Sequence, residues 1–207
     1  LLLAIDRAGL VGEDGATHAG CFDIAMLRCL PEALIMTPSG AEELRDMLFT
    51  GYQHSGLAAV RYPRGSVPNQ AIGKMNSLEI GKSHCVREGS KVALLNFGPL
   101  LDTANMVAEE NDYTLVDMRF VKPLDSDAIK QLSLSHDLLV TIEDHSVKGG
   151  AGSAVSEYLH QNGIQIPLLM LGIPDKWIEH ASRQQQLRMC SLDQAGIEGA
   201  ITKVLNP

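Results

Sequence analysis

The 207-residue sequence has little of what a disulfide framework, a metal cluster or a membrane anchor requires. Its four cysteines are widely spaced without a C-x-x-C pair, and its seven histidines show no H-x-x-x-H spacing. This usage indicates reduced thiols in a cytoplasmic protein, and we expect no metal ligands within the chain. No apolar run approaches the roughly 20 residues of a membrane span. The opening LLLAI lacks a basic start and is too short for a signal peptide, so no membrane partner is expected.

Basic residues are outnumbered as well, with 17 Lys and Arg against 25 Asp and Glu, for a net charge of −8. That sign argues against a nucleic-acid partner. An anionic ligand would need individually placed arginines rather than the general field of the protein. The hydrophobic fraction of 45% is ordinary for a globular protein and suffices for one good core or two small ones.

Short apolar runs alternate with helical patterns along the chain, which predicts an α/β fold with mainly parallel sheets covered on both faces. The expected strands are 1–5, 33–36, 58–62, 91–97, 113–118, 138–143 and 167–171. The expected helices are 22–30, 40–54, 100–110, 125–134, 150–161 and 193–205. Ser39 with Glu42 predicts a capping box, and Asp125 and Asp193 are expected to cap their helices.

The pattern weakens between residues 66 and 82, where Gly, Pro and Asn recur without a sustained period. We interpret 66–82 as a linker between a first region, 1–65, and a complete second α/β domain, 83–207. Because Leu1 already lies inside a strand-like run, we expect the sequence to begin within a domain.

The stretch 6–20, DRAGLVGEDGATHAG, carries the densest functional chemistry. Long connections without structure of their own are uncommon and tend to be functional. Arg7, Asp14 and His18 would offer an anion clamp, a hydroxyl acceptor and a group that titrates near neutral pH. By itself, however, a polar glycine-rich segment after a strand is also typical of an ordinary surface loop.

Five stretches carry a family resemblance: 6–20, LRCLPEALIMTPS (27–39), AVRYPRG (59–65), VDMRFVKPLD (116–125) and EDHSVKGGAGSAVSE (143–157). In this order they resemble the 1-deoxy-D-xylulose-5-phosphate synthase family, whose members are transketolase-like thiamine diphosphate enzymes. The resemblance covers nearly the whole chain but only the C-terminal third of such an enzyme. It implies part of a pyrimidine-binding parallel sheet over 1–65, followed by a complete transketolase C-terminal α/β domain over 83–207.

The resemblance also implies an enzymatic activity, carried out by a homodimer in the cytoplasm of a bacterium. Pyruvate and glyceraldehyde 3-phosphate would be condensed to 1-deoxy-D-xylulose 5-phosphate and CO2, a precursor of isoprenoids and thiamine. Thiamine diphosphate and Mg²⁺ would have their main ligands in an N-terminal part outside this chain, so the chain alone is expected to be inactive. Two alternatives stay open: another transketolase-like enzyme such as an E1 component, and a non-catalytic folding or assembly module.

Residue roles follow from the same resemblance. Arg7 and Arg64 would bind the substrate phosphate, His18 would move a proton at the reacting carbon, and Asp14 would accept hydrogen bonds from substrate hydroxyls. Each has a plainer alternative: a structural ion pair for either arginine, such as Arg7 with Asp6, a structural loop histidine for His18, and the capping of its own turn for Asp14. Strand alternation places Arg61 opposite Arg64, so we expect Arg61 to be structural.

Two further motifs are weaker. The E-D-G at 13–15 differs from a magnesium–diphosphate motif because no Asn follows at the required distance, the first being Asn69. The GGAGSA at 149–154 lacks the register of a dinucleotide loop and is expected to permit close helix packing. Glu143 and Asp144, just before it, are expected to lie in a solvated loop.

Overall fold

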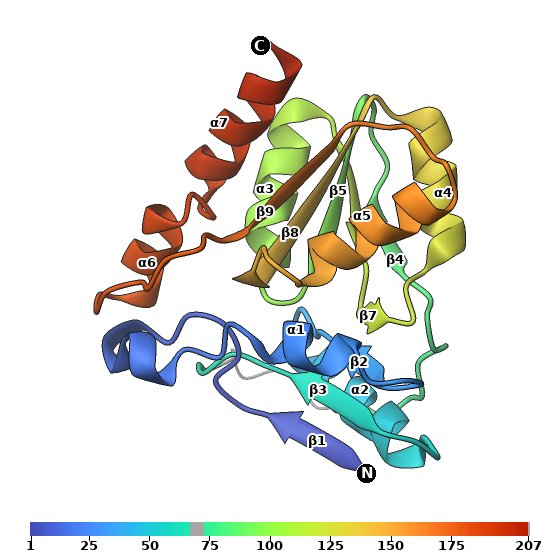
Figure 1. Ribbon diagram of the computed structural model, residues 1–207, viewed down its shortest axis with the longest axis vertical. Coiled ribbons are helices and arrows are strands. Elements are labelled where there is room, and N and C mark those ends of the chain that lie inside the picture. The colour runs from blue at the N-terminus through green and yellow to red at the C-terminus, as the bar shows by residue number, and fades with distance from the viewer. Residues whose placement is uncertain (67–72, 207) are drawn as a thin grey trace.

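Two β-sheets, stacked one above the other in Figure 1, make up the protein. The structure is a computed structural model and describes residues 1–66 and 73–206. The expected linker, 66–82, therefore lies partly outside the described residues. Among the described helices, none combines the length and the apolar character that a membrane span requires.

The first sheet has four strands in the order β1-β3-β2-β7. Their bounds are β1 Leu2–Ile5, β2 Leu34–Met36, β3 Ala58–Arg61 and β7 Phe120–Lys122. The first three strands are parallel, and β7 joins β2 in antiparallel orientation from the second half of the chain. Helix α2 (Ala41–Gln53) packs on this sheet, and Met47 lies with Met36, Val60 and Phe120 in a common apolar cluster.

The second sheet has five strands in the order β4-β6-β5-β8-β9, parallel except for β4. Their bounds are β4 His84–Arg87, β5 Val92–Phe97, β6 Thr114–Asp117, β8 Leu138–Ser146 and β9 Leu168–Ile173. Successive residues of β5 face opposite sides, so Val92 and Leu94 belong to one core cluster and Ala93 and Leu95 to another.

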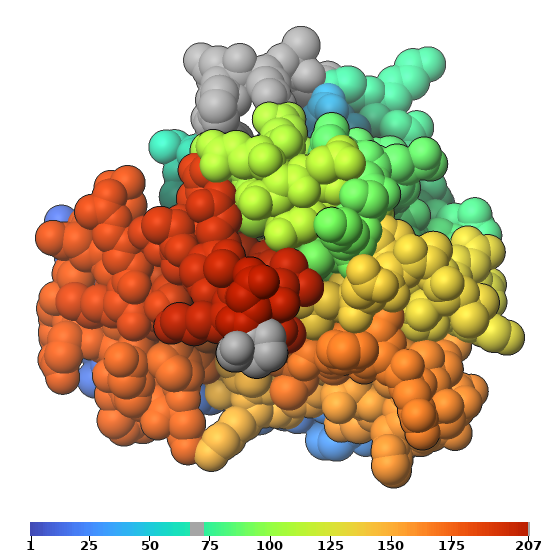
Figure 2. All heavy atoms as spheres, turned by 90° about the horizontal axis from the view of Figure 1, so that it is seen from above, coloured from blue at the N-terminus to red at the C-terminus, as the bar shows by residue number. Residues whose placement is uncertain are grey.

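Helices cover both faces of this second sheet (Figure 1). Helices α3 (Leu101–Asn111) and α7 (Gln194–Leu205) pack on one face, and α4 (Ser126–Ser135) and α5 (Ala151–Gln161) on the other. Figure 2 shows α7 in red beside α3 in yellow-green. Between the sheets lies α1 (Asp23–Arg28), which contacts strands of both.

The N-termini of the helices show which of the predicted capping residues are correct. Asp125 and Asp193 cap α4 and α7 as predicted, each accepting a backbone N–H at 3.2 Å. The capping box of Ser39 with Glu42 is wrong, because Gly40 is the N-cap and it is Glu43 that accepts from the N–H and hydroxyl of Ser39, both at 2.9 Å.

The sequence patterns missed the strands β4 and β7, the helix α6 (Arg183–Met189) and two 3-10 turns within 6–20. They also ended β8 too early, because the strand continues to Ser146. The solvated loop expected at Glu143 and Asp144 is therefore wrong: both side chains are fully buried. The predicted close packing at 149–154 is confirmed, since a Cβ at Gly152 would lie 2.5 Å from Thr141 Oγ1 of β8.

Candidate functional site

The segment 6–20 leaves the carboxyl end of β1 and is folded back on itself. Gly9 and Gly20 pair through their backbones, with N···O distances of 2.8 and 3.1 Å. Two 3-10 turns lie between them, η1 (Gly12–Asp14) and η2 (Ala16–His18). Gly9 has φ +75°, and a Cβ there would overlap the Asp144 carboxylate, so glycine is required at this position.

Three of the four predicted site residues meet at this edge of the sheet. The carboxylate of Asp14 forms a hydrogen-bonded ion pair with Arg64 and lies 3.3 Å from a guanidinium nitrogen of Arg7. Arg7 follows β1 and Arg64 follows β3, two adjacent parallel strands that end at the same edge. The hydrogen bond from Arg64 holds the pKa of Asp14 below its usual value. The result is a carboxylate between two cations.

The cluster is accessible to solvent. The side chains of Arg7 and Arg64 are 45% and 53% exposed. The guanidinium of Arg7 faces Asp14, whereas Asp6 accepts a 2.7 Å hydrogen bond from the backbone N–H of Arg7. Exposed guanidinium groups with planar donors suit an incoming phosphate or carboxylate, for which the Asp14 carboxylate is an internal stand-in.

His18 ends the second turn of the same loop and is exposed. Its Nδ1 lies 3.0 Å from the hydroxyl of Thr17. Its charge, when it is protonated, contributes to the lowered pKa of Asp14. His18 thus lies on the same loop as the cluster, with its imidazole open to the solvent.

A pocket of about 440 Å³ adjoins the cluster. Its lining includes Asp6, Ser39, Tyr62 and Arg64, which follow the carboxyl ends of β1, β2 and β3. Sequence reasoning did not select Ser39 or Tyr62 for the site. Their positions just after two predicted strands were the available signal, because ligands of parallel sheets gather at such ends.

Arg61, the last residue of β3 and three residues before Arg64, has the structural role predicted for it. Its side chain is 2% exposed, and its Nε donates to Asp23 at 2.7 Å. A second guanidinium nitrogen donates to the carbonyls of Gly20 and Asp144 at 3.1 and 3.0 Å. Arg61 therefore fixes the far end of the loop and joins the two halves of the chain.

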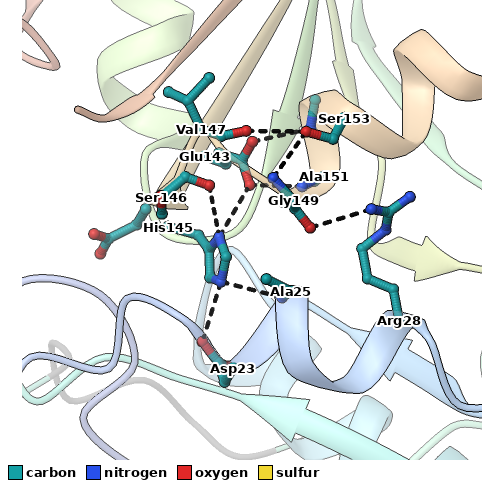
Figure 3. A network of polar contacts seen from close by, with 12 residues as sticks. Asp23, Ala25, Arg28, Glu143, His145, Ser146, Val147, Gly149, Ala151 and Ser153 are labelled. Atoms are coloured by element: carbon teal, nitrogen blue, oxygen red, sulfur yellow. Dashed lines mark hydrogen bonds and ion pairs between the residues drawn. The ribbon is translucent and has the colours of Figure 1, made fainter. Parts of the chain in front are cut away.

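Asp23, the partner of Arg61, also belongs to the buried polar network in Figure 3, where His145 lies between Asp23 and Glu143. Glu143 accepts from the backbone N–H groups of Ala151 and Gly152 at 2.7 and 2.9 Å, which explains how a carboxyl group can be buried there. Burial nevertheless raises the pKa of Glu143 to about 7.

His145 is held as the neutral imidazole. Its Nδ1–H donates to the carbonyl of Ser146 at 2.8 Å, and its Nε2 faces the N–H of Ala25 at 3.4 Å. Burial lowers the pKa of His145 to about 4. Both observations agree with a ring that stays uncharged at neutral pH.

The described residues contain no group of three or more His, Cys, Asp or Glu side chains that could hold a metal ion. The single carboxylate of the exposed cluster is already paired with two arginines. These residues do not fit a Mg²⁺–diphosphate site, whereas two exposed guanidinium groups are suited to an anionic oxygen ligand.

Two family descriptions together match most of the sequence. "Transketolase, pyrimidine binding domain" matches residues 1–70, and "Transketolase, C-terminal domain" matches residues 81–197. The chain belongs to the transketolase family. The expected fold class, a transketolase-like pyrimidine-binding sheet followed by a transketolase C-terminal α/β domain, is thereby confirmed.

Relatives within this family confirm the resemblance drawn from the five motifs. The chain is 57% identical over 207 residues to 1-deoxy-D-xylulose-5-phosphate synthase of Pseudomonas aeruginosa (strain LESB58), and 58% identical over 203 residues to that of Cellvibrio japonicus (strain Ueda107). All of this chain is covered in the Pseudomonas match and 98% in the Cellvibrio match. The chain spans about a third of the length of these relatives, 33% and 32%.

Solved transketolases share the architecture. A split-gene transketolase, solved as an inactive β4 tetramer, has a TM-score of 0.83 and 27% identity, covering 98% of this chain and 65% of that one. Transketolase from Campylobacter jejuni subsp. jejuni NCTC 11168 has a TM-score of 0.70 over 98% of this chain and 31% of its own length. Its identity of 16% shows the fold alone.

Proposed function

We propose that this chain forms the C-terminal third of a bacterial 1-deoxy-D-xylulose-5-phosphate synthase. The enzyme would condense pyruvate with glyceraldehyde 3-phosphate to 1-deoxy-D-xylulose 5-phosphate and CO2, in the cytoplasm and on the route to isoprenoids and thiamine. The observation that carries the proposal is the exposed cluster of Arg7, Asp14 and Arg64 at the carboxyl edge of a parallel sheet. Its support is the 57% identity to synthases over the whole chain.

Arg7 and Arg64 bind the phosphate of glyceraldehyde 3-phosphate in this proposal. A phosphate dianion offers more acceptor oxygens than one carboxylate, so it displaces Asp14 from between the two guanidinium groups. Asp14, then released from the two guanidinium groups, accepts hydrogen bonds from the substrate hydroxyl groups, because an aspartate carboxyl group is ordinarily ionised at neutral pH. The internal ion pairs thus keep the arginines in place until the substrate arrives.

His18 is the proposed proton donor to the alkoxide formed when the aldehyde carbon is attacked. An imidazole titrates near neutral pH and so can give and regain a proton within one turnover. Its exposure at the end of η2 leaves the ring free to meet a substrate held by the arginines.

The cofactor sites belong to a preceding part of the enzyme in this proposal. Thiamine diphosphate supplies the carbanion chemistry of this family when bound, and the described residues contain no Mg²⁺ ligand set. The split-gene relative is described as an inactive β4 tetramer, which supports the proposal that the isolated chain is inactive. A homodimer is proposed for the complete enzyme.

The test of the proposed function is Arg64→Ala in the complete enzyme. Loss of a charge-assisted bond to phosphate should raise KM for glyceraldehyde 3-phosphate about 10- to 150-fold and leave KM for pyruvate nearly unchanged. Arg64→Lys should recover part of the loss, because lysine keeps the charge without the planar fork.

The matched control for Arg64 is Arg87→Ala, which breaks another solvent-facing ion pair, that with Asp112 at 2.7 Å. It should leave both KM values unchanged. A normal KM for glyceraldehyde 3-phosphate in Arg64→Ala, accompanied by a loss of stability, would show that Arg64 is structural.

Cofactor binding by the isolated chain gives a second test. Titration calorimetry with thiamine diphosphate and Mg²⁺ should detect no binding, because the described residues do not form a metal–diphosphate site. Micromolar binding would contradict the placement of the cofactor ligands outside this chain.

A further inference from the structure

One buried side-chain amide from the second half of the chain forms hydrogen bonds with the backbone of loop 6–20. Gln186, in α6, accepts the N–H of Gly12 at 2.8 Å with its Oε1 and donates from its Nε2 to the carbonyl of Gly12 at 3.1 Å. The same Nε2 also donates to the carbonyl of Glu179 at 3.0 Å. The residue is 1% exposed, so these hydrogen bonds are shielded from water.

A second contact beside Gln186 holds Leu10, two residues before Gly12. Arg183 donates to the carbonyl of Leu10 at 3.3 Å and to the carboxylate of Asp144 at 2.7 Å. Asp144, fully buried, in turn accepts the N–H of Leu10 at 3.1 Å. Both backbone groups of Leu10 and both of Gly12 are therefore bound by side chains from residues 144–186.

The turn η1 connects Gly12, which Gln186 holds, to the exposed cluster. The carbonyl of Gly12 accepts the N–H of Gly15 at 3.1 Å, which closes the turn η1. Asp14 lies in that turn and carries the contacts to Arg7 and Arg64. A shift of Gly12 would therefore move the carboxylate that spaces the two guanidinium groups.

The approach between the loop and α6 is close. Gly12 has φ +68°, and a Cβ there would lie 3.2 Å from the backbone nitrogen of Arg183. Only a glycine backbone can adopt this conformation readily and lie this near to the start of α6.

Neighbouring glutamines in α6 do not share this role. Gln184 is exposed, and Gln185 forms the capping box of the helix with Ser182. Gln186 alone among the three is buried against the loop. The run of three glutamines therefore provides a matched control within one helix.

We propose that Gln186 is a positioning residue for the phosphate-binding cluster: its amide fixes Gly12, and through the turn η1 it sets the spacing of Arg7, Asp14 and Arg64. The transketolase C-terminal region would thus order the substrate loop of the preceding sheet. The binding part of this inference rests on the proposed function, whereas the positioning part concerns the chain by itself.

The test uses the isotope-labelled chain with Gln186→Met, which removes the amide and keeps a similar volume. Amide exchange of Gly15 is the decisive signal, since Gly15 donates within the loop and not to Gln186. We expect it to accelerate about tenfold, in line with the loss of one to two hydrogen bonds. The Kd for glyceraldehyde 3-phosphate, followed by chemical shifts, should rise about tenfold.

Two further variants separate positioning from general destabilisation. Gln184→Met should leave exchange and binding at the wild-type level. Gln186→Glu keeps an acceptor for the Gly12 N–H but places a buried carboxylate oxygen against the carbonyls of Gly12 and Glu179, so it should accelerate Gly15 exchange at least as much as Gln186→Met. Urea unfolding and the exchange of β8 amides report the stability of the remaining fold.

Unchanged Gly15 exchange in Gln186→Met overturns the proposal, as does an acceleration shared equally by β8, which indicates a merely structural residue. If the wild-type chain does not bind glyceraldehyde 3-phosphate, the binding part and the proposed use of this chain's cluster both fail. The Gly15 exchange then decides the positioning part alone, in favour if it accelerates selectively and against if it does not.

Discussion

Two carboxylate–guanidinium clusters lie close together in this protein and differ in their access to water. The outer cluster joins Asp14 to Arg7 and Arg64, with side chains 26–53% exposed. The inner pair joins Arg61 to Asp23, with side chains 2% and 11% exposed. Water screens the outer pairs, so a ligand can replace one partner. The inner pair is shielded from water, so breaking it leaves a buried charge that neither solvent nor a ligand can reach. The same two chemical groups thus permit exchange in one place and fix the fold in the other.

The largest effect expected from this comparison is on stability. Arg61→Met should lower the free energy of unfolding by about 3–5 kcal/mol, because it leaves the buried Asp23 carboxylate without its partner. Urea unfolding at neutral pH measures the change. Arg87→Met, at a solvent-facing pair, should cost less than about 1 kcal/mol. Equal losses in the two variants would remove the distinction between inner and outer clusters.

Catalysis tests the outer region next. In the complete enzyme, His18→Ala should lower kcat by about 10²- to 10⁴-fold, the usual contribution of a positioned general acid. KM for both substrates should change little, because proton transfer acts in the transition state. Steady-state kinetics measures the complete reaction, and CO2 release measures the decarboxylation of pyruvate alone.

The release of CO2 distinguishes the possible roles of His18. Pyruvate should still be decarboxylated by His18→Ala, since in the proposed reaction the acceptor aldehyde is attacked after CO2 has left. Equal loss of both steps would indicate a role in placing the cofactor, and a normal kcat would make His18 an ordinary loop histidine.

The inner region has its own pH signature. Burial raises the pKa of Glu143 from 4.5 to about 7, so the stability that its protonated form contributes is full below pH 4.5 and is lost as pH rises to about 7. Burial lowers the pKa of His145 from 6.5 to about 4, so its contribution is full above pH 6.5 and is lost as pH falls towards 4. Between pH 4.5 and pH 6.5 the two slopes oppose each other.

Glu143→Gln should leave the pH dependence of stability that comes from His145 unopposed. The free energy of unfolding of the variant should rise with pH up to about 6.5 more steeply than that of the wild type, as measured by urea unfolding across this range. Parallel profiles for the two proteins would contradict the raised pKa of Glu143.

The smallest expected effect is that of Asp14→Asn on folding. Because the pairs with Arg7 and Arg64 are screened by solvent, the urea midpoint should stay within error of the wild type. Binding of glyceraldehyde 3-phosphate should weaken in the same variant, because an amide is a poorer acceptor for hydroxyl groups than a carboxylate. A large loss of stability would instead make Asp14 part of the fold.

Periodicity predicted most of the regular structure because most elements are long enough to show a period. It missed β7, whose three residues form a strand only because β2 lies beside them. It also placed Glu143 and Asp144 in solvent, because the groups that satisfy them, such as Arg183 and the start of α5, are supplied by tertiary structure. Local sequence carries no sign of such partners.

The candidate site was predictable to a similar degree. Arg7, Asp14 and Arg64 could be selected by resemblance, and the structure brings them together. Gln186 could not, because a glutamine in a polar helix gives no indication that it contacts a loop 174 positions away. The roles assigned to the four predicted residues remain predictions until they are measured.

The strand β7 has a consequence for how the protein could be recombined. Phe120 of β7 packs with Met36 and Met47, so one edge strand of the first sheet is supplied by the second half of this chain. A chimera joined near residue 82 would take this strand from a different parent than the three strands beside it. A breakpoint placed between the two matched family domains therefore divides the first sheet. The two parents of such a chimera must have compatible side chains at Phe120 and at the residues it packs against.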